Sequence, residues 1–306
     1  MKDNNSWRLS VGIAACVFIM LISVFSLWKA ALPHDESAGD DGGIQVVATV
    51  YPLYVSLLNI TAGTPANLEL LTHQAAGCAH ETQLTTGDMK RVEAADLVVA
   101  CGEGMEGFLD ALQSTKGAAI VAVCEGWPKL MVGNPHIWLS TDGAAYMVER
   151  ITDALIAIDS TNAVLYKRNC DEYTSRLAVL GVHLKEAMSP YRNAQVVLLH
   201  EAFVYLASEA GFDVAFALSE HELSSPVAKR ISEVSSLLRD ARGQGDNVLC
   251  VADMTDYACV RAIEAEAGID VLRLSTCTTG DPTPLAYINA MEANIALLAR
   301  ALGGSN

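Results

Sequence analysis

The chain has 306 residues, a length that suits two lobes or one large domain. Acidic residues outnumber basic ones by 36 to 20, and the net charge of −16 argues against nucleic acid as a partner, because phosphate binding needs a basic surface. Apolar residues make up 51% of the chain and charged residues 18%, which is the reverse of the balance in a disordered protein.

The first feature along the chain is an uncharged apolar run, Leu9–Trp28, between Arg8 and Lys29. At about 1.5 Å of rise per residue, a helix of this length spans a bilayer core of about 30 Å. Basic residues precede the run and acidic residues follow it, which places the N-terminus in the cytoplasm and the rest outside. We therefore expect residues 1–32 to be a membrane anchor or signal segment, with the remainder at the extracytoplasmic face of the membrane or in the periplasm.

Three fates of this segment fit its sequence. We favour a retained helical anchor, because no small-x-small cleavage site follows the apolar run. A cleaved signal is the first alternative. The second is a lipid on Cys16, since Ile13–Cys16 is similar to a lipoprotein box. Residues 33–43 are acidic and glycine-rich, and this composition predicts a flexible stalk.

From residue 44 onward, apolar strands alternate with helices. In the first half we expect strands at 44–50, 67–71, 96–101 and 118–124. The helices predicted there are a short one ending near 60, then 88–94, 105–113 and 141–158, with a loop over 125–140. One long helix is predicted over 162–188, and it ends at Ser189-Pro190.

The alternation restarts after the long helix. We expect strands at 195–199, 214–218, 247–252 and 270–274, and helices at 202–209, 226–240, 256–267 and 285–301. This pattern is typical of parallel sheets covered by helices. We therefore predict an α/β fold of two lobes, each with a mainly parallel sheet flanked by helices and joined by one long bridging helix. The predicted boundaries are 44–160 for the N-terminal lobe, 161–190 for the bridging helix and 191–306 for the C-terminal lobe.

Eight cysteines are present, seven of them outside the apolar run, and no two form a CxxC pair. This is neither a zinc-finger pattern nor a dense disulfide framework. We expect most of them to be small buried hydrophobic residues. Cys101 and Cys124 each end a predicted strand, so one disulfide between them is left open as an alternative.

Three of the seven histidines, His80, His136 and His200, lie at or near breaks in the predicted elements. Ligands of open α/β sheets bind beyond the carboxyl ends of the strands, where side chains converge, and His200 directly ends a strand. Imidazoles from separate loops suit Zn²⁺ or a similar divalent metal. Taken one at a time, a histidine is more often a hydrogen-bonded structural residue, and we expect that role for the other four.

Several motifs follow one another in a recognisable order: Val47–Tyr54, Gly77-x-x-His80, Ala95–Val99, Asn134–Ser140, His200–Leu206, and Tyr287 with Met291 and Asn294. Together they resemble the metal-binding solute-binding proteins of ATP-binding-cassette importers (cluster A-I, zinc and manganese type), over about residues 44–302. The resemblance implies two lobes bridged by a long helix, with the metal between them and His80, His136 and His200 as ligands. Histidine at the third ligand position is similar to the zinc binders, and the softness of imidazole supports Zn²⁺ over Mn²⁺.

The chain departs from this family at the fourth ligand. Many members place an aspartate just after the last strand, where Ser275 stands here. The fourth position is therefore left open among Ser275, Cys277, Asp281, a carboxylate from elsewhere and a water molecule. The loop 125–134 is short and lacks histidine, so we do not expect it to gather metal.

By resemblance, we expect high-affinity capture of Zn²⁺, or alternatively Mn²⁺, and its delivery to the permease and ATPase subunits of an importer. We expect a monomer. A manganese- or iron-binding member of the family and a metal-dependent surface adhesin are the alternatives. An enzyme is disfavoured, because His200-Glu201 is not part of an HExxH motif and the chain has no Gly-x-Ser-x-Gly elbow or P-loop. Histidine ligands must be deprotonated, so metal affinity should fall as the pH drops through about 6.5.

Overall fold

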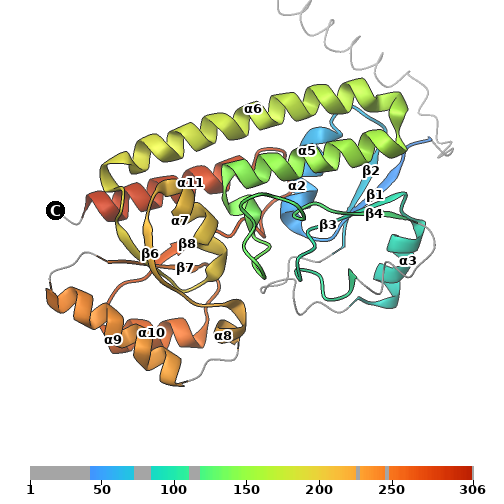
Figure 1. Ribbon diagram of the computed structural model, residues 1–306. Helices are drawn as coiled ribbons and strands as arrows, with labels where there is room; N and C mark the ends of the chain where they lie inside the picture. Colours follow the sequence, from blue (N-terminus) through green and yellow to red (C-terminus); the bar gives the residue numbers. More distant parts are fainter. Residues whose placement is uncertain (1–41, 72–83, 110–117, 225–227, 245–247, 305–306) are drawn as a thin grey trace, which may run out of the picture. The chain divides into compact units, whose positions relative to one another are not determined.

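The computed structural model describes residues 42–71, 84–109, 118–224, 228–244 and 248–304 (Figure 1). The predicted anchor, most of the predicted stalk, Cys16 and His80 therefore lie outside the described residues. Among the residues that are described, no helix has both the length and the hydropathy needed to cross a bilayer. The described chain from Gly43 onward belongs to one compact unit.

The first half forms a four-stranded parallel sheet in the order β2-β1-β3-β4. Its strands are β1 (Gln45–Ala48), β2 (Asn67–Leu70), β3 (Leu97–Ala100) and β4 (Ala119–Ala122). The central strands β1 and β3 are apolar and almost wholly buried, as expected for parallel strands covered on both faces. The helices of this half are α2 (Tyr51–Ile60), which has Pro52 in its first turn, and α3 (Thr86–Ala94).

The second half repeats this topology, with a parallel sheet in the order β6-β5-β7-β8. Its strands are β5 (Gln195–Leu198), β6 (Asp213–Ala217), β7 (Leu249–Asp253) and β8 (Leu272–Leu274). Its helices are α7 (Val204–Ala210), α8 (Glu220–Ser224), α9 (Ala228–Gln244), α10 (Ala258–Ala267) and α11 (Ala286–Gly303). In both sheets, the strand that comes first in the chain lies between the second and the third. We call each sheet with its helices a lobe.

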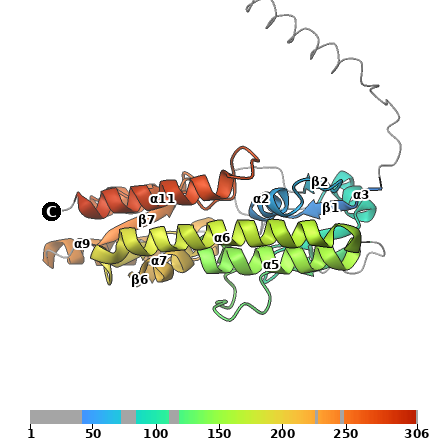
Figure 2. The same ribbon diagram turned by 90° about the horizontal axis from the view of Figure 1, so that it is seen from above.

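Two helices connect the lobes in the sequence: α5 (Thr141–Ile158) and the long α6 (Ala163–Met188) (Figures 1 and 2). Helix α6 contacts α2 and α5 on the N-terminal side and α7 and α11 on the C-terminal side, so it bridges the two lobes. Its buried apolar residues recur every three or four positions, the spacing of one helix face: Tyr166, Cys170, Tyr173, Leu177, Leu180, Leu184 and Met188. One apolar core cluster runs along this face and includes residues of both sheets.

The predicted α/β fold with two parallel sheets and a long bridging helix is confirmed. The structure differs from the predicted elements in two places. In the helix predicted over 105–113, Met105–Phe108 form a bend and a turn after a left-handed backbone at Gly102, Glu103 and Gly104, Leu109 is helical, and residues 110–113 lie outside the described residues. No helix was predicted between the strand 214–218 and the helix 226–240, where α8 lies. It begins at a capping box: the Glu222 carboxylate accepts from Ser219 N at 2.9 Å, and Ser219 Oγ accepts from Glu222 N at 3.4 Å.

The six cysteines within the described residues are buried, as predicted for most of them, and the disulfide alternative was wrong. Cys101 and Cys124 lie beside each other at the ends of β3 and β4, where Cys124 N donates to Cys101 O at 3.0 Å, but both thiols are free. Burial raises the pKa of the Cys101 thiol well above its ordinary value, so it stays protonated. The other described cysteines are also free and buried: Cys170, Cys250, Cys259 and Cys277.

Candidate metal centre

His136 lies in the loop between β4 and α5, and only 1% of it is exposed. Its ring nitrogen Nδ1 is 3.0 Å from Asn134 Oδ1, which also accepts from the His136 backbone N–H at 3.2 Å. Because Oδ1 can only accept, the ring proton lies on Nδ1. In a ring protonated at Nδ1, the lone pair that can bind a metal is on Nε2, the arrangement that is usual for histidine ligands held by an outer partner.

His200 follows β5 and is fully buried. Its Nδ1 accepts from Ala202 N at 3.1 Å, at the start of a short 3-10 turn, Glu201–Phe203. The neutral ring with this bond carries its proton on Nε2. A neutral ring that bound a metal through Nε2 would carry its proton on Nδ1 and would give up the bond from Ala202, and a metal at Nδ1 would also replace that bond. Either way, the backbone bond sets the orientation of the ring before a metal arrives.

The two rings meet between the lobes. Their centroids are 5.6 Å apart and the ring planes are nearly perpendicular, at 89°. Zinc–nitrogen bonds of 2.0–2.1 Å in a tetrahedral site place two ligand rings about 5 Å apart, so this separation suits one shared metal ion. Trp138 packs against His136 at 5.1 Å and Phe203 against His200 at 6.3 Å, which gives the pair an apolar surround.

The fourth-ligand candidates are placed as follows. Ser275 Oγ accepts from Cys277 N at 3.0 Å, and Asn294 bonds both backbone groups of Ser275 at 2.8 Å, so Ser275 is held in a turn. Burial raises the pKa of the Cys277 thiol to about 12, which disfavours the thiolate that a metal needs. Asp281 is exposed and uses its backbone O to accept from Tyr51. Within the described ranges, no three or more His, Cys, Asp or Glu residues are grouped to hold a metal.

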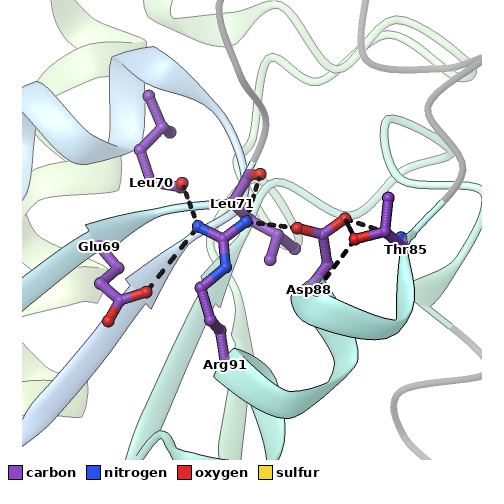
Figure 3. Close-up of polar contacts among 6 residues, drawn as sticks. All are labelled: Glu69, Leu70, Leu71, Thr85, Asp88 and Arg91. Atoms are coloured by element: carbon purple, nitrogen blue, oxygen red, sulfur yellow. Dashed lines mark hydrogen bonds and ion pairs between the residues drawn. The ribbon is translucent and has the colours of Figure 1, made fainter.

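The segment that carries His80, residues 72–83, is outside the described residues, but its two ends are held by one polar network (Figure 3). Arg91 of α3 donates to the carbonyls of Leu70 and Leu71 at 3.2 and 3.3 Å and pairs with Asp88. Asp88 in turn accepts from Thr85 N at 2.7 Å and completes a capping box at the start of α3. The bond from the Thr85 backbone is the largest contribution that lowers the Asp88 pKa. The network therefore fixes where the chain leaves β2 and enters α3.

Contacts between the lobes surround the histidine pair, and none of them was predicted. Trp138 Nε1 donates to Thr276 O at 2.8 Å, and Tyr287 Oη donates to Trp138 O at 2.7 Å. Tyr205 and Asn134 make further contacts between the lobes, described below. The sequence signal for these residues was weak, since they are aromatic and amide side chains within motifs and their partners are about 70 to 150 positions away.

A family model described as ZnuA, "Zinc-uptake complex component A periplasmic", matches residues 46–301 of the chain. The iron-binding protein YfeA of Yersinia pestis is 25% identical over 240 residues, covering 74% of this chain and 76% of YfeA. The zinc-binding lipoprotein AdcA of Streptococcus pneumoniae serotype 4 is 27% identical over 310 residues, covering 92% of this chain. The chain spans only 60% of the length of AdcA.

Solved structures share the fold. The solute-binding protein FpvC from Pseudomonas aeruginosa, in complex with Mn²⁺, superposes with a TM-score of 0.75 at 24% identity, covering 86% of this chain and 100% of FpvC. The laminin-binding protein Lmb of Streptococcus agalactiae, described as having adhesin and metal-transporting activity, superposes with a TM-score of 0.73 at 18% identity, covering 85% of this chain and 100% of Lmb. At these identities the likeness shows the two-lobed architecture.

Proposed function

The chain belongs to the zinc-uptake component A family of metal-binding solute-binding proteins, and from this premise we propose that it captures Zn²⁺ outside the cytoplasm for delivery to an importer of the ATP-binding-cassette type. Members of this family are transport binding proteins and not enzymes, in agreement with the prediction from the sequence. The observation that carries the proposal is the pair of buried imidazoles, His136 and His200, which come from different lobes and have ring centroids 5.6 Å apart.

The preference for zinc rests on the chemistry of the donors. Imidazole nitrogen suits Zn²⁺, whereas Mn²⁺ prefers carboxylate, carbonyl and water oxygen. We propose His80 as the third ligand, on the residue-by-residue resemblance of its motif. Ser275, Cys277, Asp281 or water completes the site, and the raised thiol pKa of Cys277 makes water the simplest choice. The relatives differ in cargo, since AdcA is named for zinc, YfeA for iron and FpvC is seen with Mn²⁺.

A metal site between two lobes suits a carrier protein, which must both hold its cargo and release it. A cargo held by one ligand from each lobe is released when the lobes move slightly apart, because the ligand set is then incomplete. The long helix α6 packs on both lobes and limits this motion to small displacements. The expected partners are therefore the permease of the importer, which would receive Zn²⁺ from the opened site, and the ATPase subunit that works with the permease.

The test is calorimetric titration of the metal-stripped full chain, kept in mild detergent, with Zn²⁺ and with Mn²⁺. We expect one tight Zn²⁺ per chain and weaker Mn²⁺. His136→Ala and His200→Ala should each reduce zinc affinity by more than about 100-fold, since even loss of an outer partner of a ligand costs about 10–100-fold. His80→Ala tests the third ligand in the same way.

The control is His183→Ala. This histidine lies on α6, about half exposed, and pairs with Glu292 at 2.8 Å, so its loss should leave zinc affinity unchanged. Wild-type zinc affinity in both His136→Ala and His200→Ala would overturn the site. Tighter binding of Mn²⁺ than of Zn²⁺ would overturn the zinc assignment but keep the site. Zinc uptake by the source cells that does not depend on the chain would overturn the carrier role and favour the adhesin alternative.

A further inference from the structure

Asn134 is a buried residue whose side-chain amide bonds to both lobes. Its Oδ1 accepts from the backbone N–H of His136 at 3.2 Å and lies 3.0 Å from Nδ1 of the His136 ring. Its Nδ2 donates to the backbone O of Glu201 in the C-terminal lobe at 2.9 Å. Glu201 directly follows His200, so one amide group connects the backbone beside one histidine to the ring of the other.

Tyr205 of α7 holds the same loop from the C-terminal lobe. Its hydroxyl donates to Asn134 O at 2.7 Å and accepts from Met131 N at 2.9 Å. Only 3% of the residue is exposed, and its ring packs against Trp127 at 5.3 Å. Both the backbone and the side chain of Asn134 are therefore bonded to the C-terminal lobe.

These bonds lie where the lobes must part if the cargo is to leave. The loop 131–134 leads directly into His136, and the residues that hold it, Glu201 and Tyr205, directly follow His200 or lie one turn further on. Separating His136 from His200 requires breaking the bonds from Asn134 Nδ2 and from Tyr205 Oη. Because Asn134 and Tyr205 are buried, water replaces these bonds only after the lobes have begun to separate.

We propose that Asn134 and Tyr205 form a latch between the lobes that slows metal release, with Asn134 also positioning the His136 ring; this rests on the proposed metal site. The role requires an amide at position 134. An aspartate there would still accept from His136, but it would place a second acceptor against the carbonyl of Glu201 and lose that bond. The chemistry of asparagine thus serves both functions with one group.

Three variants separate latching from positioning. Tyr205→Phe removes only the hydroxyl, and Asn134→Asp keeps the acceptor for His136 while losing the donor to Glu201. We expect each to raise the rate of Zn²⁺ dissociation about tenfold, the factor that one net buried hydrogen bond supplies. Asn134→Ala loses both contacts, so it should also weaken capture, because the His136 ring is no longer held in one orientation. The rates are measured by stopped-flow chelator competition on the zinc-loaded full chain.

The matched control is Tyr146→Phe, which removes a tyrosine hydroxyl that donates to Glu125 O at 2.8 Å within the N-terminal lobe and should leave the dissociation rate unchanged. A double variant, Tyr205→Phe with Asn134→Asp, should be less than additive, because both changes open the same latch. Unchanged dissociation rates in both single variants would overturn the latch. If His136→Ala retains wild-type zinc affinity, the metal site itself is wrong, which is a separate result from failure of the latch alone.

Discussion

The two sheets have the same strand order, but the points where their strand order reverses are used differently. In the N-terminal sheet this point lies between β1 and β3, and a buried carboxylate fills it. Glu106 accepts from Thr49 Oγ1 at 2.5 Å, from Cys101 N at 2.8 Å and from Gly102 N at 2.9 Å. Burial raises the pKa of this carboxyl, while the three bonds oppose that effect.

In the C-terminal sheet the corresponding point lies between β5 and β7, and two buried polar side chains, His200 and Asp253, lie there. His200 follows β5 there. Asp253 ends β7 with 5% exposure, and its Oδ1 is buried without a hydrogen-bond partner among the described atoms. Equal topology therefore provides two equivalent positions. Glu106 occupies the first with hydrogen bonds from its own lobe, and at the second we propose His200 as a metal ligand. The N-terminal lobe supplies His136 from the loop after β4 instead.

The largest expected effect tests which position binds metal. His200→Ala should lower zinc affinity by more than about 100-fold. Thr49→Val, next to the equivalent position in the N-terminal sheet, should leave zinc affinity within about threefold, because the Thr49 hydroxyl donates to the Glu106 carboxylate within the N-terminal lobe. Calorimetry on the two variants side by side measures the contrast. Similar losses in both would show that the two positions are not used differently.

The next effect concerns folding stability in the N-terminal lobe. Glu106→Gln replaces one acceptor oxygen by an NH₂ group facing the backbone donors of Cys101 or Gly102. One buried N–H then lacks a partner, which should cost about 1–3 kcal/mol of unfolding free energy. Urea unfolding of the full chain in detergent measures it. An unfolding free energy equal to that of the wild type would mean that the hydrogen bonds to Glu106 do not stabilise this lobe.

A smaller effect is expected at the capping box of α3, with a defined pH dependence. The pKa of Asp88 is lowered below its ordinary value of 3.8, so its stabilising contribution is present above pH 3.8 and is lost as the pH falls through the lowered value. Asp88→Asn should cost on the order of 1 kcal/mol at neutral pH. Its unfolding free energy should converge with that of the wild type in acid. A difference independent of pH would contradict the role of the ionised carboxylate.

The smallest effect is expected at Asp253. Asp253→Asn removes a charge whose Oδ1 lacks a hydrogen-bond partner within the described structure, so the unfolding free energy should change by less than about 0.5 kcal/mol or rise slightly. The same urea experiment measures it, with Glu106→Gln as the comparison. A loss of unfolding free energy as large as that of Glu106→Gln would show that Asp253 stabilises the C-terminal lobe as Glu106 stabilises the N-terminal lobe.

Much of the fold could be predicted because its elements are locally encoded. The apolar spacing of α5 predicted its bounds, and Ser189-Pro190 marked the end of α6. The missed helix α8 had a signal in Ser219-x-x-Glu222, which is a capping box in sequence. The turn at Met105–Phe108 had no signal of comparable strength. Its buried Glu106 carboxylate accepts from the nearby backbone of Cys101 and Gly102 and from the distant Thr49 side chain, and these bonds override helix propensity there.

The site could be predicted in part. His136 and His200 were named from their place at breaks in the elements and from the resemblance, and the structure brings them together. The roles of His80, His136 and His200 as ligands, the fourth ligand and the domain boundaries stay predictions. Asn134 and Tyr205 were not singled out, because an asparagine two residues before a histidine and a tyrosine on a helix are common, and only their partners 67 and 71 positions away give them a role.

The sequence by itself determined the α/β alternation, the long bridging helix and the family, because hydrophobic periodicity, turn residues and motifs are properties of short segments. Only the tertiary structure decided which strand end is closed by its own hydrogen bonds, which histidines face each other and which side chains tie the lobes together. Those depend on partners far apart in the chain, whose distance and orientation are fixed when both sheets pack against α6.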